Sequence, residues 1–306
     1  MRYAYARGVA HPLSRVVLGA SGVRDAEKAR LLDSFVEAGG NCIDTARVYG
    51  GGTSEKAVGE WIRRARPDAL TILGKGAHPP NCVPSMIEIE LAQSLDALGV
   101  DRIDLYLLHR DDPQIPVDEF VDALEAQVAA GRIGAYGGSN WSYARLMEAN
   151  RYAIGRGCLG MVAVSNHFSL AEPVEPLYPG CESTPGKLQR YLGEAGISLF
   201  PWSSQGRGFF ADVPADALDP NVWRCWDSPG NRGRRDRARE LAARLGVPAI
   251  NVALAYVLNQ PFPTFPIIGP QNGEELAIAL RGTAIQLDAA QLRWLETGAG
   301  SESTPA

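Results

Sequence analysis

Short apolar runs alternate along the chain with longer stretches in which apolar residues recur every three or four positions. Runs of the first kind predict strands and stretches of the second kind predict helices. The helical spacing is clearest over 25–38, and it recurs from 54, from 84, over 117–130, over 142–155 and at about 187–195. The predicted strands lie at 15–18, 42–44, 70–75, 104–109, 133–138, 160–164, 197–200 and 264–268.

This order of elements predicts one domain over residues 1–297, an α/β fold of the (β/α)8 TIM-barrel class. The alternative is an open doubly wound sheet, which usually carries a GxGxxG turn after its first strand. The first loop here reads GASG, so the closed barrel is favoured. We further expect a long loop after strand seven (205–234), an added C-terminal helix (287–296) and a disordered tail (298–306).

Composition removes several classes of function. The net charge of −5 argues against a nucleic-acid partner, and the longest apolar stretch, 252–258, is too short to span a membrane. The five cysteines form no CxxC pair, and the four histidines are scattered without the paired acidic or cysteine ligands of a metal motif, so we expect no metal site. Free thiols and the lack of a signal-like N-terminus favour a cytoplasmic protein, either a monomer or a homo-oligomer.

Four ionisable side chains follow neighbouring predicted strands: Asp44 and Tyr49 after the second, Lys75 after the third and His109 after the fourth. Strand ends of a barrel meet at one mouth, so these groups should lie together. Singly, each has an ordinary structural interpretation, such as a cap or a buried polar contact. Together, a phenol made acidic by a buried ammonium, a carboxylate partner and an imidazole suit protonation of a carbonyl oxygen. None of them donates hydride, so a reduction would require a cofactor.

The segments GGNCIDTARVYGGGTSEKAVG, RIDLYLLHRDD, GRIGAYGGSN and WSSQGRG, together with the strand end at Lys75, resemble the aldo-keto reductase family over nearly the whole chain. The resemblance implies an NAD(P)(H)-dependent oxidoreductase that interconverts a carbonyl compound and an alcohol. It implies Tyr49 as general acid, Lys75 and Asp44 as the groups that tune it, and His109 as the residue that positions the carbonyl.

The resemblance also implies a set of cofactor contacts. Two residues would bond the nicotinamide amide, an aromatic ring would stack on the nicotinamide, one loop would follow the pyrophosphate and a later segment would hold the adenosine end. The amide contacts would be Ser139 and Asn140, and the stacked ring would be Trp202. The pyrophosphate loop would contribute Ser203, Gln205, Gly206 and Gly208, and the adenosine segment would contribute Gly269, Gln271 and Glu275.

Two positions depart from the family pattern. Ser165 replaces a Gln that usually bonds the carboxamide, so that contact is lost or passes through water. The adenosine segment, GPQNGEELAIAL, lacks both the usual basic residue for a 2′-phosphate and the Glu-Asn pair. NADP(H) stays favoured over NAD(H) as the family default, with the preference open. Arg207 or the arginines of 232–237 could supply the missing charge.

Two alternatives keep the fold and change the function: a cofactor-binding regulatory subunit with little turnover, and a cofactor-free sugar isomerase. The substrate of an enzyme here would be a small carbonyl or alcohol. Polar and aromatic candidates for the rim suit a hydroxylated carbonyl, such as a sugar, better than a steroid. These candidates are Arg47, His78, Arg110, Asp111, Asp112, Trp141 and Asn166. Loop-stabilising hydrogen bonds are expected of both His78 and His167, and Trp223 and Trp226 either pack the long loop onto the barrel or line the pocket.

Overall fold

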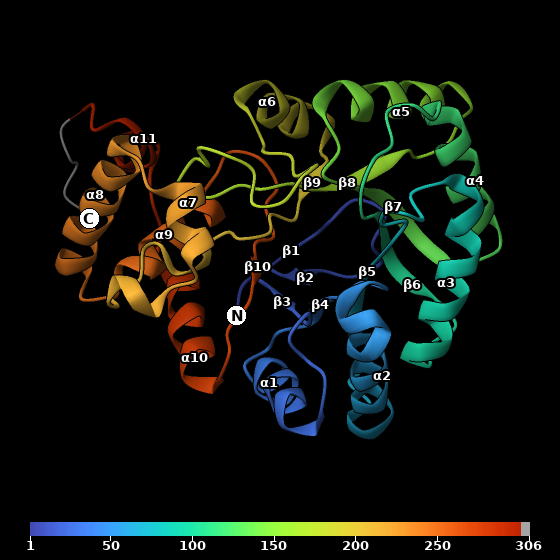
Figure 1. Cartoon of the computed structure of the whole chain (residues 1–306), viewed down its shortest axis with the longest axis horizontal. Coiled ribbons are helices and arrows are strands. Elements are labelled where there is room, and N and C mark those ends of the chain that lie inside the picture. The colour runs from blue at the N-terminus through green and yellow to red at the C-terminus, as the bar shows by residue number, and fades with distance from the viewer. Residues whose placement is uncertain (301–306) are drawn as a thin grey trace.

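Eight parallel strands form the centre of the molecule in the computed structural model, which describes residues 1–300. Their order in the sheet is β10-β3-β4-β5-β6-β7-β8-β9, so seven of the strands follow one another in chain order and the last lies beside the first (Figure 1). The strands are β3 Val17–Gly19, β4 Cys42–Asp44, β5 Thr71–Gly76, β6 Ile103–Leu108, β7 Ile133–Ser139, β8 Met161–Ser165, β9 Ser198–Leu199 and β10 Ile267–Ile268.

The sheet closes between β9 and the segment that leads into β10. Leu199 forms a parallel bridge with Thr264, its N–H donates to Pro263 O at 2.8 Å, and its carbonyl accepts from Phe265 N at 2.7 Å. A sheet whose edges are joined in this way has no unpaired edge. The predicted (β/α)8 barrel is therefore confirmed, with shorter strands at the seam than the sequence predicts.

Helices surround the strands on the outside (Figure 1). Apolar side chains of the strands and helices pack between the two layers, as expected for parallel strands buried on both faces. Among the described residues no single helix is long and apolar enough to cross a membrane; α8 and α9 pass that test only as a pair bent by 101°. The helices are α1 Ala26–Glu37, α2 Thr53–Ala65, α3 Pro84–Leu98, α4 Val117–Ala129, α5 Tyr143–Gly155, α6 Gly186–Ala195, α7 Pro220–Trp226, α8 Pro229–Leu245, α9 Ala249–Leu258, α10 Gly273–Arg281 and α11 Ala289–Thr297.

A second, smaller apolar cluster fills the barrel itself. Cys42, Leu73 and Leu107 belong to it, and the rings of Phe200 and Phe265 stack there at 5.1 Å. Side chains alternate between the two faces of a strand. The residues two positions further along β4, β5 and β6 therefore also turn inward, at the carboxyl ends of the strands. Those positions carry the ionisable side chains of the predicted site.

The N-terminus forms a short antiparallel hairpin that the sequence pattern does not predict. Its strands are β1 Tyr3–Ala4 and β2 Leu13–Ser14, and Leu13 is buried in the barrel cluster. Asn41, just before β4, accepts from Ser14 N through its side-chain oxygen at 2.6 Å. The hairpin therefore covers the amino end of the barrel, opposite the predicted site.

Two excursions leave the carboxyl ends of late strands. The predicted long loop after β9 is present, and it carries two 3-10 turns (Gly206–Gly208 and Ala215–Ala217) and the helix α7. Its predicted end at residue 234 is too late, because α8 already begins at Pro229. A second excursion, 166–185 after β8, is not predicted. The added C-terminal helix is confirmed as α11. Of the tail predicted to be disordered, residues 301–306 lie outside the described residues.

Candidate active site

Asp44, Lys75 and Tyr49 meet at the barrel mouth. Lys75 Nζ donates to the Asp44 carboxylate, lies 3.3 Å from Tyr49 Oη and is 3.4 Å from Thr45 O. Asp44 and Lys75 are each 3% exposed, whereas Tyr49 is only half-buried. The ammonium is therefore surrounded by oxygen atoms and reaches solvent only through the phenol.

A glycine turn places the tyrosine. The 3-10 turn Tyr49–Gly52 contains Gly50, Gly51 and Gly52 at φ values of 58°, 63° and 93°. These left-handed conformations strain any residue with a Cβ. The start of the loop is tied to the next strand, because Arg47 N donates to Lys75 O at 2.9 Å. The YGGG sequence thus turns the phenol back over the end of β5.

His109 lies one residue beyond β6, with its ring edge-on to Tyr49 at 5.7 Å and to His78 at 5.0 Å. Its Nδ1 is buried without a hydrogen-bond partner among the described residues. Burial, followed by the nearby charges of Lys75 and Arg110, holds the pKa of His109 well below its usual value. The imidazole is therefore neutral at physiological pH.

The loop that carries His78 is fixed by a residue that the sequence pattern does not single out. Glu90, on the apolar face of α3, accepts from Ala77 N at 2.6 Å and from Asn81 Nδ2 at 2.8 Å. Ala77 has a φ of 57°, which is costly for a residue with a side chain. The buried carboxylate stabilises this backbone and holds His78 beside His109.

The electrostatics differ in one respect from the sequence-based prediction. Burial alone would lower the pKa of the Lys75 ammonium, but Asp44 and Tyr49 raise it above its usual value. Burial raises the pKa of Tyr49, and Lys75 acts against that rise without cancelling it. The expected net lowering of the phenol pKa is therefore absent here: desolvation of the phenolate outweighs its attraction to the ammonium.

The residues predicted to bond the nicotinamide amide lie at the ends of β7 and β8. Ser139 Oγ donates to Ser165 O at 2.9 Å and accepts from Asn140 Nδ2 at 3.0 Å, while Asn140 Oδ1 accepts from Glu182 N at 3.1 Å. Asn140 Nδ2 also lies 3.5 Å from His109 O. Ser165 Oγ is buried with no partner among the described residues. These three residues form one cluster next to His109.

The predicted platform and pyrophosphate loop follow β9. Trp202 is half-buried and Ser203 has a φ of 51°, while Gly206 and Gly208 have φ values of 61° and 94°. Gln205 Nε2 reaches Ile250 O at 3.4 Å, which ties the loop to α9. Positive φ values also occur at Ala77 and Asn140, so non-glycine residues with left-handed backbone lie at three strand ends around the mouth. Such conformations cluster at functional sites.

The predicted adenosine segment lies at the start of α10. Gln271 N donates to the Glu275 carboxylate at 2.8 Å, and Gln271 Nε2 donates to Gly269 O at 3.0 Å. Lys28 of α1 reaches this segment, with Nζ 2.9 Å from Gln271 O. Sequence reasoning missed Lys28 because barrel closure is what brings α1 beside α10. Of the cations proposed instead, Arg207 pairs with Asp219 at 3.9 Å.

Two of the predicted rim residues are buried in the structure. Trp141 is fully buried and donates through Nε1 to Arg110 O at 3.3 Å, and Asn166 accepts from Trp141 N at 3.2 Å. Asp111 is held by Arg145 in a bidentate ion pair at 2.8 Å. These three side chains lie beneath the mouth, so fewer residues than predicted line its accessible rim. His78 and Arg110 are half-buried at the edge of the mouth.

A parallel barrel whose strand ends bring a tyrosine, a lysine, an aspartate and a histidine together has an arrangement suited to acid–base chemistry at its mouth. The sequence model of the aldo/keto reductase family matches residues 15–297. The chain belongs to that family. It is 30% identical to the uncharacterized oxidoreductase YrpG of Bacillus subtilis (strain 168) over 332 aligned positions, which cover 100% of this chain and 99% of YrpG.

Two solved structures share the fold. The thermostable aldo-keto reductase Tm1743, solved with the inhibitor epalrestat, superposes with a TM-score of 0.77 at 23% identity, covering 97% of this chain and 99% of its own. An aldo-keto reductase from Klebsiella pneumoniae, solved with NADPH, superposes with a TM-score of 0.75 at 22% identity, covering 96% and 94%. At these identities the likeness concerns the barrel alone.

Proposed function

We propose that this chain is an NAD(P)(H)-dependent oxidoreductase that interconverts a small carbonyl compound and its alcohol, with Tyr49 as the general acid. The observation that carries the proposal is the position of Tyr49 Oη, 3.3 Å from a buried ammonium that is itself paired with Asp44. A nicotinamide cofactor, when bound, supplies the hydride that no side chain of the chain can provide.

In the reductive direction Tyr49 donates its proton to the carbonyl oxygen as negative charge develops there. The tyrosinate that remains faces Lys75 Nζ, so the charge left behind is stabilised at the moment it forms. Asp44 keeps Lys75 protonated and oriented throughout. The neutral His109 donates a hydrogen bond to the same carbonyl oxygen and holds it toward the phenol. The oxidative direction runs through the same groups with Tyr49 as the base.

The residues at the mouth fit a nicotinamide. Ser139 and Asn140 carry side-chain oxygen and nitrogen atoms at the end of β7, the groups that can bond a carboxamide. Trp202 offers an aromatic face at the next strand end. Ser203 and Gln205, with the left-handed Gly206 and Gly208, suit close approach of a pyrophosphate to the backbone.

NADP(H) is favoured over NAD(H). The related Klebsiella pneumoniae enzyme was solved with NADPH, and Lys28 places an ammonium beside the adenosine segment at Gln271. A flexible ammonium can bond a 2′-phosphate. Glu275 in the same segment opposes this choice, since its carboxylate repels a second anion. The balance of these two charges sets the preference.

The substrate class that the mouth suits is a polar, hydroxylated carbonyl. The polar groups at its edge, His78 and Arg110, can bond the hydroxyl groups of such a substrate, which a steroid or a long aliphatic chain lacks along most of its length. The decisive experiment mixes the protein with NADPH or NADH and a panel of aldehydes and ketones, and follows absorbance at the nicotinamide band. Turnover that prefers hydroxylated carbonyls supports the proposal. Tight nucleotide binding without turnover on any carbonyl would replace it with a regulatory role.

A further inference from the structure

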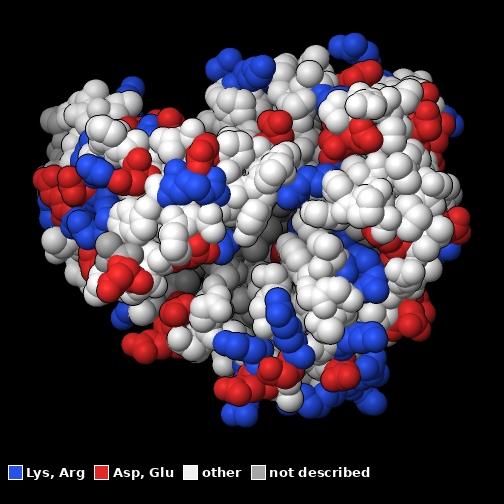
Figure 2. Space-filling model, viewed as in Figure 1, with Lys and Arg blue, Asp and Glu red and all other residues white. Residues whose placement is uncertain are grey.

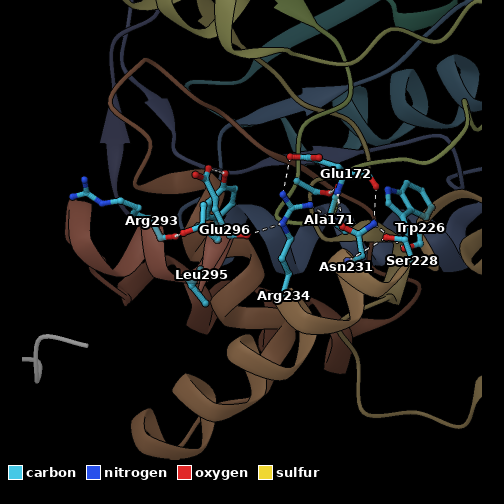
Figure 3. Close-up of polar contacts among 12 residues, drawn as sticks. Ala171, Glu172, Trp226, Ser228, Asn231, Arg234, Arg293, Leu295 and Glu296 are labelled. Carbon is cyan, nitrogen blue, oxygen red and sulfur yellow. Dashed lines mark hydrogen bonds and ion pairs between the residues drawn. The ribbon is translucent and has the colours of Figure 1, made fainter. Parts of the chain in front are cut away.

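The charged side chains on the face shown in Figure 2 are mixed in sign, without a large single-sign patch. A hollow of about 390 Å³ lies at the start of α8, and both arginines of its wall are already bonded. Arg234 pairs with Glu172 at 2.7 Å (Figure 3), and Arg237 donates to the carbonyl oxygens of Leu295 and Glu296 at 2.9 Å and 3.0 Å. Neither feature therefore indicates a further charged ligand.

The arginine two residues before Tyr49 is bonded through both its backbone and its side chain. Arg47 N donates to Lys75 O at 2.9 Å, which joins the start of the loop to β5. The guanidinium donates through Nη1 to the Glu55 carboxylate of α2 at 3.3 Å and through Nε to Gln93 Oε1 of α3 at 3.1 Å. This one residue therefore joins the loop to a catalytic strand and to two helices.

A glycine at the end of the same turn makes room for the guanidinium. A Cβ at Gly52 would overlap Arg47 Nη1 and would lie 2.8 Å from Arg47 Cζ. Gly52 also has a φ of 93°, a conformation that favours glycine. The Arg47 side chain thus folds over the end of a turn whose start its own backbone holds, and the turn between them carries Tyr49.

Glu55 depends on this guanidinium. Its side chain is fully buried, and among the described residues Arg47 is the one basic group paired with it. Burial raises the pKa of Glu55, the Arg47 charge acts against that rise, and the carboxylate of Glu90 adds to it. Removal of the guanidinium would leave a buried carboxylate unpaired, whereas removal of both charges would not.

We propose that Arg47 is a positioning residue for Tyr49: its ion pair with Glu55 holds the glycine turn in the conformation that keeps the Tyr49 hydroxyl beside Lys75 Nζ. This inference rests on the proposed function, because it concerns how the proton donor of that reaction is placed.

The composition of the turn explains why such a tie is needed. Three consecutive glycines, 50–52, give the turn many alternative conformations, since glycine adopts positive and negative φ about equally. Without the ion pair the turn samples these conformations, and Tyr49 Oη leaves its position 3.3 Å from the ammonium. A misplacement of about 1 Å lowers a rate by up to about 10²-fold.

Backbone amides of the turn report its conformation without any turnover. Tyr49 N donates to Ala46 O at 3.0 Å, and Gly51 N donates to Val48 O at 3.1 Å. Hydrogen exchange of such amides measures local opening. A loosened turn should therefore exchange faster over 46–53 in the protein alone, with neither nucleotide nor substrate present.

The test compares Arg47→Met, Arg47→Lys and the double variant Arg47→Met with Glu55→Gln, each in the full chain. In Arg47→Met we expect exchange of the turn amides to be at least about tenfold faster and kcat for carbonyl reduction to fall about 10- to 100-fold, while nucleotide affinity changes little. Arg47→Lys keeps a cation beside Glu55 but cannot bond Gln93 at the same time, so it should recover part of both losses.

The double variant separates positioning from stability. It contains no unpaired buried charge, so its urea midpoint should return toward that of the wild type, while exchange stays fast and kcat stays low because the tie is still missing. It also carries the test if Arg47→Met folds poorly. A double variant that restores exchange and kcat as well would show that Arg47 acts through stability alone, and this overturns the proposal.

Arg64→Met is the matched control. Arg64 lies at the opposite end of α2 and pairs with Asp33 at 2.8 Å, so its loss should change neither the exchange over 46–53 nor kcat. Wild-type exchange in folded Arg47→Met overturns the inference, and so does wild-type kcat despite fast exchange. If the unmodified protein reduces no carbonyl, the proposed function fails separately, and the exchange result still decides whether Arg47 holds the turn.

Discussion

Lys75 Nζ stands between the Asp44 carboxylate and Tyr49 Oη, inside a barrel mouth where lysine and aspartate are each 3% exposed. Neither charge can be solvated by water, so each depends on the other. The ion pair therefore affects both the stability of the fold and the pKa of the Tyr49 phenol.

Replacing Tyr49 by Phe removes the hydroxyl and leaves the ring that lies edge-on to His109 at 5.7 Å. Loss of a general acid lowers the rate about 10²–10⁴-fold. We therefore expect kcat for carbonyl reduction to fall by that range while nucleotide affinity, followed through tryptophan fluorescence, changes little. A Tyr49→Phe enzyme with full activity would refute the role of this phenol.

Asp44→Asn leaves Lys75 as an uncompensated charge in a buried site. Breaking a buried ion pair on one side costs about 3–5 kcal/mol, whereas replacing both partners by uncharged residues is much less harmful. We expect Asp44→Asn to lower the free energy of unfolding by that amount and Asp44→Asn with Lys75→Met to recover most of it. Urea titration measures both. Recovery of activity in the double variant would argue against a catalytic part for Lys75.

His167 makes stability depend on pH. Burial lowers the pKa of His167 to about 3, while an unfolded histidine titrates near 6.5. Between those values the unfolded chain binds a proton that the folded chain does not, so stability falls as the pH falls from about 6.5 toward 3. The pKa of His109 is also lowered by burial, so His109 likewise reduces the stability of the fold as the pH falls.

The check is the free energy of unfolding measured in urea from pH 7 to pH 4. One such group contributes a slope of up to about 1.4 kcal/mol per pH unit. His167→Asn should reduce the slope by a large part of that value. The same substitution at half-buried His11, which bonds Thr71 Oγ1 at 2.9 Å, controls for the loss of a histidine hydrogen bond. Equal slopes in wild type and His167→Asn would contradict the prediction.

Lys28→Ala removes the ammonium beside Gln271 O. If this group bonds a 2′-phosphate, affinity for NADPH falls about five- to tenfold and affinity for NADH stays the same, because a charge-assisted bond contributes about 1–3 kcal/mol. Fluorescence titration with both nucleotides measures the ratio. Lys56→Ala on α2 is the control for a lysine away from the adenosine segment. A parallel loss for both nucleotides would assign Lys28 a structural part only.

Asn231 of α8, which is 1% exposed, forms buried hydrogen bonds that predict a stability effect at a residue remote from the mouth. Asn231→Ala removes buried hydrogen bonds to Glu172 and Trp226 and leaves their backbone groups unpaired, which costs about 2–4 kcal/mol. Thermal unfolding should show a lower Tm by several degrees. Asn221→Ala on α7, whose side chain bonds within its own turn through Asp219, should change Tm little.

The barrel and the central site could be predicted because both follow from strand alternation. In β5 the alternation puts Leu73 and Lys75 on the inner face, and the same rule applied to β4 and β6 places Asp44 and His109. The closed barrel then brings these strand ends together. Asp44, Lys75 and His109 are each located by their own strand, whereas Tyr49 depends on the glycine turn that follows β4.

The positions of Trp226 and Lys28 could not be predicted in the same way. Trp226 lies in α7, a helix of the excursion after β9, and its position depends on Asn231, which also binds Glu172 of the excursion after β8. Lys28 meets Gln271 only because the last strand pairs with the first. Contacts of this kind are set by tertiary packing, which leaves no periodic signal in the sequence.

The seam at Leu199 and Thr264 gives the barrel a built-in asymmetry. The strands on either side of it, β9 and β10, have two residues each, whereas β5, β6 and β7 on the opposite side have six or seven. Fewer inter-strand bonds mean a lower cost of transient opening. We therefore expect transient opening of the barrel wall to be concentrated at this seam, in the segment 198–202 that leads from β9 to Trp202.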